Sequence, residues 1–307
     1  MRITQSMLSN NMLRNLSTSY YKMGKLQEQI NTGKKVNRPS DDPVVAMKGM
    51  GYRMQVDKVA QYQRNMGEVH NRLDSSDDAL DKVGSALIRV QELTVDAAND
   101  TKTHDDRLKI LKEIEQLQAQ VRDLANTKVG DKHLFSGTKT DSPLFGENAA
   151  GDKTIGGVVM PVSPGTIPAE GFEKDITIEV FDGVELNVNT NGYKLFKELD
   201  DVMSGLIATI KAGKSGEEIS NHLKDINKAQ DSVLETRADI GARQNRAEMM
   251  ENRLESQEAA AKKQMSENED IDYEKTITEM ITQESIHRAA LSVGARIIQP
   301  SLVDFLR

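Results

Sequence analysis

The chain has 307 residues, of which 37% are hydrophobic, 29% are charged and none is cysteine, and its formal net charge is −8. The acidic balance argues against a nucleic-acid partner, which would favour a basic face. The lack of cysteine excludes disulfides and cysteine metal sites. No apolar run is longer than residues 44–47, so no membrane span is expected, and residues 1–6 lack the apolar stretch of a signal peptide.

The first predicted element is a helix that ends near residue 32. Its apolar side chains recur at seven-residue spacing, the period of one helix face: Leu16, Met23 and Ile30. Gly33 suits the left-handed position after a helix end. Asp42 can cap the next helix with its carboxylate, and Pro43 has the φ of a first helical residue.

Residues 44–142 contain no proline and predict long helices. Two interleaved sets of apolar residues alternate at spacings of four and three, the pattern of a coiled-coil seam: Val69, Val83, Val90 and Ala97 with Leu73, Leu80 and Leu87. After a polar turn at residues 99–106, a second apolar stripe over 111–124 predicts the returning arm of a hairpin.

Residues 130–193 differ in character, because they contain most of the prolines and many of the glycines. Alternating apolar residues flank Asp182 and Gly183, which predicts a β-hairpin with a type I′ turn. We expect a small β-rich insert at the far end of the helical hairpin.

The next long helix carries an unbroken seven-residue repeat: Ile219, Ile226, Val233, Ile240, Ala247, Leu254 and Ala261. A helix with one narrow apolar stripe must pair with another, and the arm over residues 44–100 is the expected partner.

The C-terminal segment carries apolar residues on two adjacent helix faces. One face holds Ile277, Ile281, Leu291, Ala295, Ile298, Leu302 and Phe305, and the other holds Ile286, Ala290, Val293 and Ile297. Basic residues prevail in 1–40 and acids in 270–307, so the two ends are expected to lie together. Because one partner helix cannot cover both faces, we expect other subunits to bury the rest.

Three segments resemble the bacterial flagellin family, in the order and at the ends of the chain where that family carries them. They are NTGKKVNRPSDDP at 31–43, TRADIGARQNR at 236–246 and GARIIQPSLVDFLR at 294–307. The residues that carry the first two are Gly33, Asn37, Ser40, Asp41, Asp42, Pro43, Gly241, Gln244, Asn245 and Arg246. The resemblance implies a mainly α, elongated helical hairpin and coiled-coil bundle, with paired terminal helices and a small β-rich insert.

Departures from flagellin select a branch of the family. Pro39 and Pro43 bracket the acid pair where flagellins usually carry alanines, and the ending over residues 298–306 is similar to hook-associated proteins of the hook–filament junction. This resemblance implies a structural subunit that self-assembles between hook and filament and supports flagellin polymerisation. The alternatives are flagellin itself and a secreted coiled-coil protein of an injection system.

The resemblance also implies partners and a location. The partners would be other copies of the chain, a hook-associated protein on the hook side, flagellin on the filament side and an export chaperone at the C-terminal region. Export through the flagellar type III apparatus would place the protein outside the cell. The polymerisation interface is expected at Leu16, Met23, Ile30, Leu291, Ile298, Leu302 and Phe305.

The sequence predicts three regions. They are a terminal polymerisation region over 1–42 and 268–307, a helical hairpin over 43–129 and 194–267, and the β-rich insert over 130–193. No catalytic, metal-binding or cofactor-binding constellation is expected. Residues 208–215 loosely match a phosphate-binding loop, but a helix precedes them, so Gly213 is interpreted as a helix end and Lys214 as a surface residue.

Overall fold

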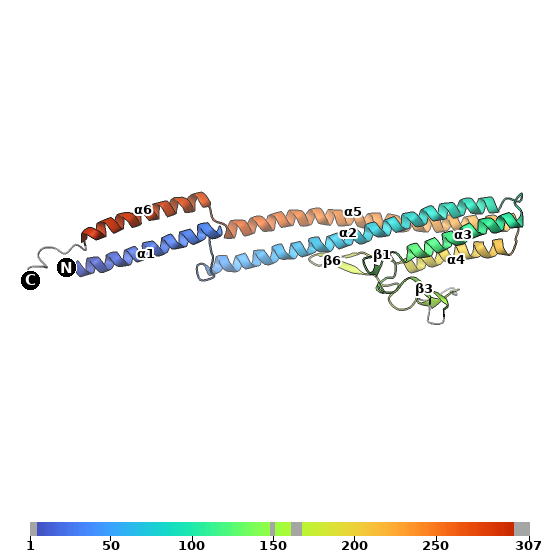
Figure 1. Ribbon diagram of the computed structural model, residues 1–307, viewed down its shortest axis with the longest axis horizontal. Helices are drawn as coiled ribbons and strands as arrows, with labels where there is room; N and C mark the ends of the chain where they lie inside the picture. Colours follow the sequence, from blue (N-terminus) through green and yellow to red (C-terminus); the bar gives the residue numbers. More distant parts are fainter. Residues whose placement is uncertain (1–4, 148–150, 161–167, 298–307) are drawn as a thin grey trace, which may run out of the picture. The chain divides into compact units, whose positions relative to one another are not determined.

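The computed structural model describes residues 5–147, 151–160 and 168–297 (Figure 1). Its helices are α1 (Gln5–Thr32), α2 (Pro43–Ala97), α3 (His104–Ala125), α4 (Gly192–Lys211), α5 (Gly216–Glu269) and α6 (Tyr273–Ile297). Short antiparallel strands lie between α3 and α4. This arrangement confirms the predicted, mainly α fold with a small β-rich part.

The strands form small separate sheets. They are β1 (Lys128–Val129) with β2 (Lys132–His133), then β3 (Phe145–Glu147), β4 (Lys153–Ile155) and β5 (Val158–Val159), and finally β6 (Thr177–Phe181) with β7 (Val184–Asn187). Each neighbouring pair is antiparallel.

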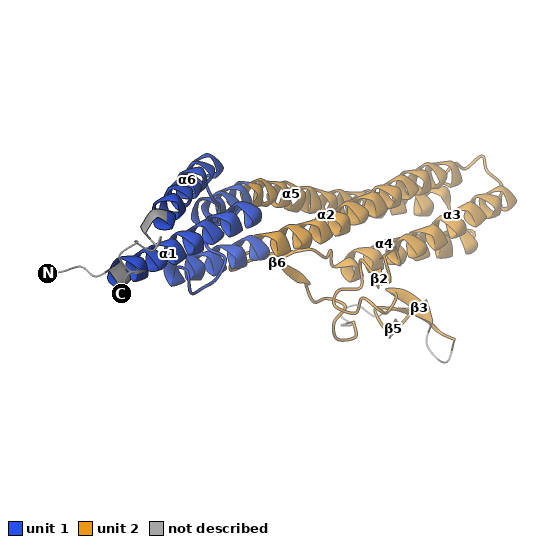
Figure 2. Cartoon of the chain, turned by 60° about the vertical axis from the view of Figure 1, so that its left-hand side comes forward, with its two compact units in different colours: residues 1–58, 256–307 blue, residues 59–255 orange. Residues whose placement is uncertain are grey.

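The chain divides into two compact units (Figure 2). Unit 1 comprises residues 1–58 and 256–307, and unit 2 comprises residues 59–255. Helices α2 and α5 contribute residues to both units. The three functional regions predicted from the sequence remain a prediction.

Unit 2 is built on the two predicted helical seams. All seven residues of the α2 seam, from Val69 to Ala97, are at most 1% exposed, as are the six members of the α5 repeat in unit 2, from Ile219 to Leu254. Polar contacts fix the register between the helices: Gln244 donates to Asp74 at 2.8 Å, and Arg237 lies 2.9 Å from Asp77. The predicted pairing of α5 with the α2 arm is therefore confirmed.

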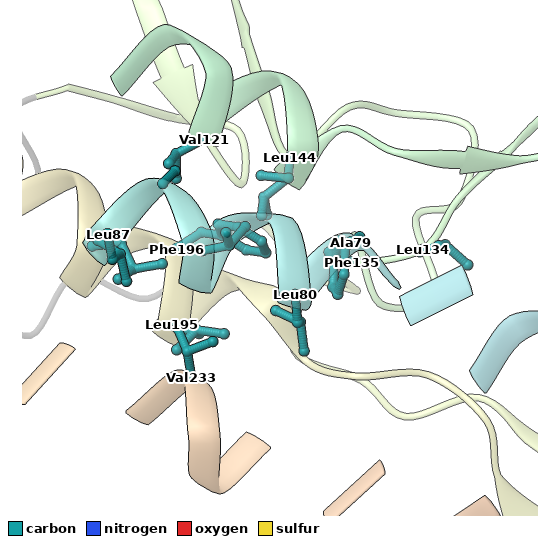
Figure 3. Close-up of a cluster of buried hydrophobic side chains, with 14 of the residues drawn as sticks. Ala79, Leu80, Leu87, Val121, Leu134, Phe135, Leu144, Leu195, Phe196 and Val233 are labelled. Atoms are coloured by element: carbon teal, nitrogen blue, oxygen red, sulfur yellow. The ribbon is translucent and has the colours of Figure 1, made fainter. Parts of the chain in front are cut away.

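Helices α3 and α4 cover a further face of this core. Leu111, Ile114 and Val121 of α3 are buried, as the predicted returning arm requires. The rings of Phe135 and Phe196 meet edge to face at 5.0 Å within the cluster shown in Figure 3.

The predicted hairpin at Asp182 and Gly183 is present, but its predicted turn type is wrong. A type I′ turn requires positive φ at both central residues, and among the described residues only glycines have positive φ, with Gly183 at 70°. An irregularity in the strand register between Glu179 and Phe181 accompanies this turn.

The predicted location of the insert is also wrong. Its β6 strand lies against α2, where Tyr62 donates to the Glu179 carboxylate at 3.1 Å and Asn65 donates to the Glu179 carbonyl at 2.8 Å. The end of the hairpin is instead closed by two turns, which Arg107 joins by donating to the Lys214 carbonyl at 3.0 Å. Side-chain contacts between distant residues, which periodicity does not reveal, hold the insert on α2.

Lys214 follows the end of a helix and does not follow a strand. Helix α4 ends at Lys211, Gly213 has φ of 66°, and the Lys214 ammonium lies 3.1 Å from the Glu218 carboxylate. A phosphate-binding loop requires a preceding strand and N–H groups that point at the phosphate. The interpretation of Gly213 as a helix end is confirmed.

We therefore expect Lys214→Ala to be silent. Both partners of the Lys214–Glu218 pair are about half exposed, and such surface pairs contribute little to stability. Chemical denaturation and motility should match those of the wild type. ATP hydrolysis by the purified protein that is lost in Lys214→Ala would contradict this expectation.

Candidate subunit interface

Helices α1 and α6 run side by side in unit 1 (Figure 1), and small and polar side chains of α6 take part in their contact. Gly294 is buried, and a side-chain carbon there would collide with Met12. Gln283 donates to the hydroxyl of Ser19 at 2.8 Å, and Thr276 is 8% exposed. Close approach and hydrogen bonding therefore help to hold this pair, beside half-buried apolar residues of α1 such as Leu16 and Met23.

Helix α6 exposes large apolar residues on both of the faces predicted from the sequence. Its large apolar residues are 43–57% exposed: Ile277, Ile281, Ile286, Leu291 and Val293. This is the reverse of an ordinary amphipathic helix, which turns its apolar stripe inward. Exposed apolar residues that gather on one part of a protein are typical of interaction surfaces.

Helix α1 also exposes large apolar side chains. They are Met7, Leu8, Leu13, Tyr20 and Tyr21, with exposed fractions of 45–70%. Of the predicted interface residues, Leu16, Met23 and Ile30 are half-buried, and Leu291 is half exposed. Ile298, Leu302 and Phe305 lie outside the described residues. The predicted interface as a set stays a prediction.

The first turns of α2 add a third apolar surface to unit 1. Val44, Met47, Met50 and Met54 are 56–69% exposed. Gly51 lies among them with no atom within 4 Å of the position that a side chain would take. Methionine side chains adapt their shape to a partner. Most of the large apolar side chains exposed in the described chain thus belong to unit 1.

The loop over residues 33–42 is tied at both ends by the residues that resemble the flagellin family. Gly33 has φ of 70° directly after α1, and Asp42 accepts hydrogen bonds from the N–H groups of Val44 at 3.0 Å and Val45 at 3.1 Å. Both predicted helix caps are confirmed, and Pro43 is the first residue of α2. The acid pair is architectural in this arrangement.

The neighbouring Asp41 ties the loop back to α1. Its carboxylate lies 3.2 Å from the ammonium of Lys25. The hydrogen bond from Lys25 lowers the pKa of Asp41 below its ordinary value. Ser40 is exposed, and Asn37 is half-buried in the same loop.

The second family segment belongs to unit 2, whereas the first belongs to unit 1. Gln244 binds Asp74 across the α2–α5 seam, whereas Asn245 and Arg246 are exposed. No atom lies within 4 Å of a side-chain position on Gly241. The segment thus contributes one contact that fixes the register of α5 against α2, and its other side is exposed.

Sequence reasoning missed Glu269, the last residue of α5. Its side chain is 7% exposed and lies 2.7 Å from the Lys34 ammonium and 2.6 Å from the Arg53 guanidinium. Burial opposes its ionisation, but the hydrogen bonds from Arg53 and Lys34 outweigh burial, and the pKa of Glu269 lies below its ordinary value. No local sequence pattern links three residues so far apart.

Metal-binding groups and membrane-spanning helices were sought among the described residues. No group of three or more histidine, aspartate or glutamate side chains there is placed to hold a metal ion. Within the same residues, every helix is too short or too polar to cross a membrane.

Comparison with known proteins gives matches at both ends of the chain. Residues 3–140 match the bacterial flagellin N-terminal helical region, and residues 223–306 match the bacterial flagellin C-terminal helical region. Flagellar hook-associated protein 3 of Escherichia coli K12 is 26% identical over 305 residues, which cover 94% of this chain and 95% of that protein.

Two crystal structures share the fold. Bacillus cereus FlgL aligns with a TM-score of 0.57 at 22% identity, over 70% of this chain and 99% of that one. The flagellar junction protein FlgL from Legionella pneumophila aligns with a TM-score of 0.53 at 15% identity, over 72% of this chain and 100% of that one.

Proposed function

The chain belongs to the bacterial flagellin family, and from this membership we propose that it is the structural subunit of the hook–filament junction. In this proposal copies of the chain assemble on the hook and form the platform on which flagellin polymerises. The protein then acts by packing against other subunits and needs no catalytic site.

The observation that carries the proposal is that α6 exposes its large aliphatic side chains. Its aliphatic side chains lie outside, while Thr276, Gln283 and Gly294 face α1. Burying one large aliphatic side chain contributes about 1.5–3 kcal/mol. Several aliphatic side chains of α6 are exposed in the single chain. They can contribute this stabilisation only when a neighbouring subunit buries them.

Two features favour the junction over the filament. The similarity to flagellar hook-associated protein 3 extends over nearly the whole of both chains. Pro39 and Pro43 bracket the acid pair, and each fixes its own φ and removes a backbone donor. Flagellin itself is the second candidate. The paired flagellin-like ends disfavour a coiled-coil protein of an injection system.

The proposed partners are those that the resemblance to the family implies. They are further copies of the chain, a hook-associated protein on the hook side and flagellin on the filament side. The apolar side chains exposed on α6 would promote aggregation before assembly. We therefore include an export chaperone that covers the C-terminal region, and export through the flagellar type III apparatus without a cleaved signal peptide.

Immunogold labelling of intact flagella tests the location. Antibodies raised against the purified chain should label a narrow band between hook and filament. The hook and the length of the filament should remain unlabelled. Label distributed along the whole filament would favour flagellin and contradict the junction assignment.

A further inference from the structure

Two breaks between helices meet in unit 1 and are joined by backbone hydrogen bonds. The N–H of Lys35 donates to the Glu269 carbonyl at 2.6 Å, and the N–H of Ile271 donates to the Gly33 carbonyl at 3.1 Å. Lys34 and Asp270 pair as an isolated antiparallel bridge. We call residues 33–35 and 269–271 the joint, because α1 leads into it and α6 leads out of it.

The Glu269 side chain ties the joint to α2. Its carboxylate accepts from Lys34 in the joint at 2.7 Å and from Arg53 of α2 at 2.6 Å. Next to it, Asn268 donates to the Val45 carbonyl at 3.0 Å. One buried carboxylate therefore connects the exit of α1, the start of α2 and the end of α5.

Gly49 of α2 leaves room for this carboxylate. Gly49 is buried, and a side-chain carbon there would collide with Oε1 of Glu269 and lie 3.2 Å from its carboxyl carbon. Glycine in a helix interior costs about 0.5–1 kcal/mol relative to alanine. The close approach of Glu269 explains why glycine occupies this position despite its cost in stability.

The contacts of Glu269 lie where α1 ends and just before α6 begins, so they can fix the rotation of both helices about their axes. An α-helix has about 3.6 residues per turn, so a shift of one residue turns every side chain by about 100°. The exposed apolar residues of α1, α6 and the start of α2 keep fixed directions toward neighbouring subunits only if these helices keep a fixed rotation.

We propose that Glu269 is a positioning residue for assembly, which holds α1 and α6 in the rotation that presents the apolar surface of unit 1 to a neighbouring subunit. This inference rests on the proposed function, because it assumes that unit 1 binds other subunits. Glu269 itself acts through Lys34 and Arg53 and need not touch the neighbour.

Glu269→Gln tests the proposal in a competition between variant and wild-type chains for incorporation into flagella. Removing the charge replaces the charge-assisted hydrogen bonds from Lys34 and Arg53, whose side chains are partly exposed, with weaker ones to a buried amide, so incorporation should fall at least about tenfold. Glu267→Gln is the matched control, since Glu267 is exposed, lies on the same helix and pairs only loosely with Lys263 at 3.9 Å. Gly49→Ala, which keeps every charge, should reproduce the defect.

A second measurement separates positioning from general stability. The chain has no cysteine, so spin labels at Gln55→Cys and Ala289→Cys report the distance between α2 and α6 within unit 1 without background labelling. We expect a narrow distance distribution in the wild type and a broad one in Glu269→Gln, with unchanged thermal unfolding of unit 2. An unchanged narrow distribution, or wild-type incorporation, would overturn the proposal.

The pH dependence gives a third readout. Lys34 and Arg53 face the Glu269 carboxylate, and Asp270 follows it in the chain. Because these partners lower the pKa of Glu269 in the folded state, its contribution is complete at pH values above its ordinary, unfolded pKa and is lost as pH falls through the lowered folded pKa. The gap in incorporation between wild type and Glu269→Gln should close on acidification. A constant gap would count against the role of the charge.

Failure of this inference can be told apart from failure of the proposed function. If Glu269→Gln incorporates normally while Ile281→Asp does not, the subunit interface stands and the positioning role is lost. If neither change affects incorporation, unit 1 is not the interface and both proposals fall.

Discussion

Ile281→Asp is expected to abolish incorporation of the chain into flagella while the monomer stays folded. Ile281 is 57% exposed on the outward face of α6, so water can solvate an aspartate there in the free subunit. In an assembly the same carboxylate would be buried without a partner, which costs several kcal/mol. Every contact between subunits would carry that cost. The incorporated fraction should be measured by sedimentation of flagella, and the fold by circular dichroism.

Two further substitutions make this result specific. Val159 in the β5 strand of the insert is 47% exposed, so Val159→Asp introduces the same charge on a similar surface outside unit 1 and should incorporate normally. Leu291→Asp changes a residue of the predicted interface and should behave like Ile281→Asp. If Ile281→Asp and Leu291→Asp both incorporated like the wild type, the outward face of α6 would not bind a neighbour.

The long seams could be predicted because their spacing is compatible only with a helix that buries one narrow apolar stripe. An unbroken seven-residue repeat from Ile219 to Ala261 leaves one narrow stripe, and each of its members is at most 1% exposed. The helix ends could be predicted for a similar reason. Gly33 and Asp42 act within a few residues of their own position.

The orientation of α6 could not be read from periodicity. The spacing of Ile277, Ile281 and Leu291 identifies a common face but does not say whether α1 or a neighbour covers it. The orientation depends on the fit of Gly294 against Met12 and on the hydrogen bond from Gln283 to Ser19. Both are contacts between residues at opposite ends of the chain.

The joint at Glu269 could not be predicted for the same physical reason. Lys34, Arg53 and Glu269 are ordinary charged residues when each is considered with its neighbours in sequence. They form a structural contact only because folding buries the Glu269 carboxylate between the two cations. The turn at Asp182 shows a milder form of this limit, because the composition identifies a hairpin but not the strand irregularity that accompanies its turn.

Deleting the gene is expected to leave cells with hooks, without filaments, and with flagellin shed into the medium. The reason lies in how subunits stack. A subunit that propagates indefinitely needs an upper surface that matches its lower one. An adaptor instead needs one surface for its own ring and the hook side, and another that accepts flagellin. Without the adaptor, flagellin finds no surface on which to start. Electron microscopy of the mutant cells and immunoblots of the medium measure the two outcomes.

Complementation connects this prediction to the interface. The wild-type gene and Val159→Asp should restore filaments, whereas Ile281→Asp should not, because its outward α6 face no longer accepts an apolar neighbour. The purified chain should also fail to grow long filaments from flagellar fragments, since its two stacking surfaces differ. Normal filaments on cells without the gene, or long filaments grown from the purified chain alone, would place it in the filament and not at the junction.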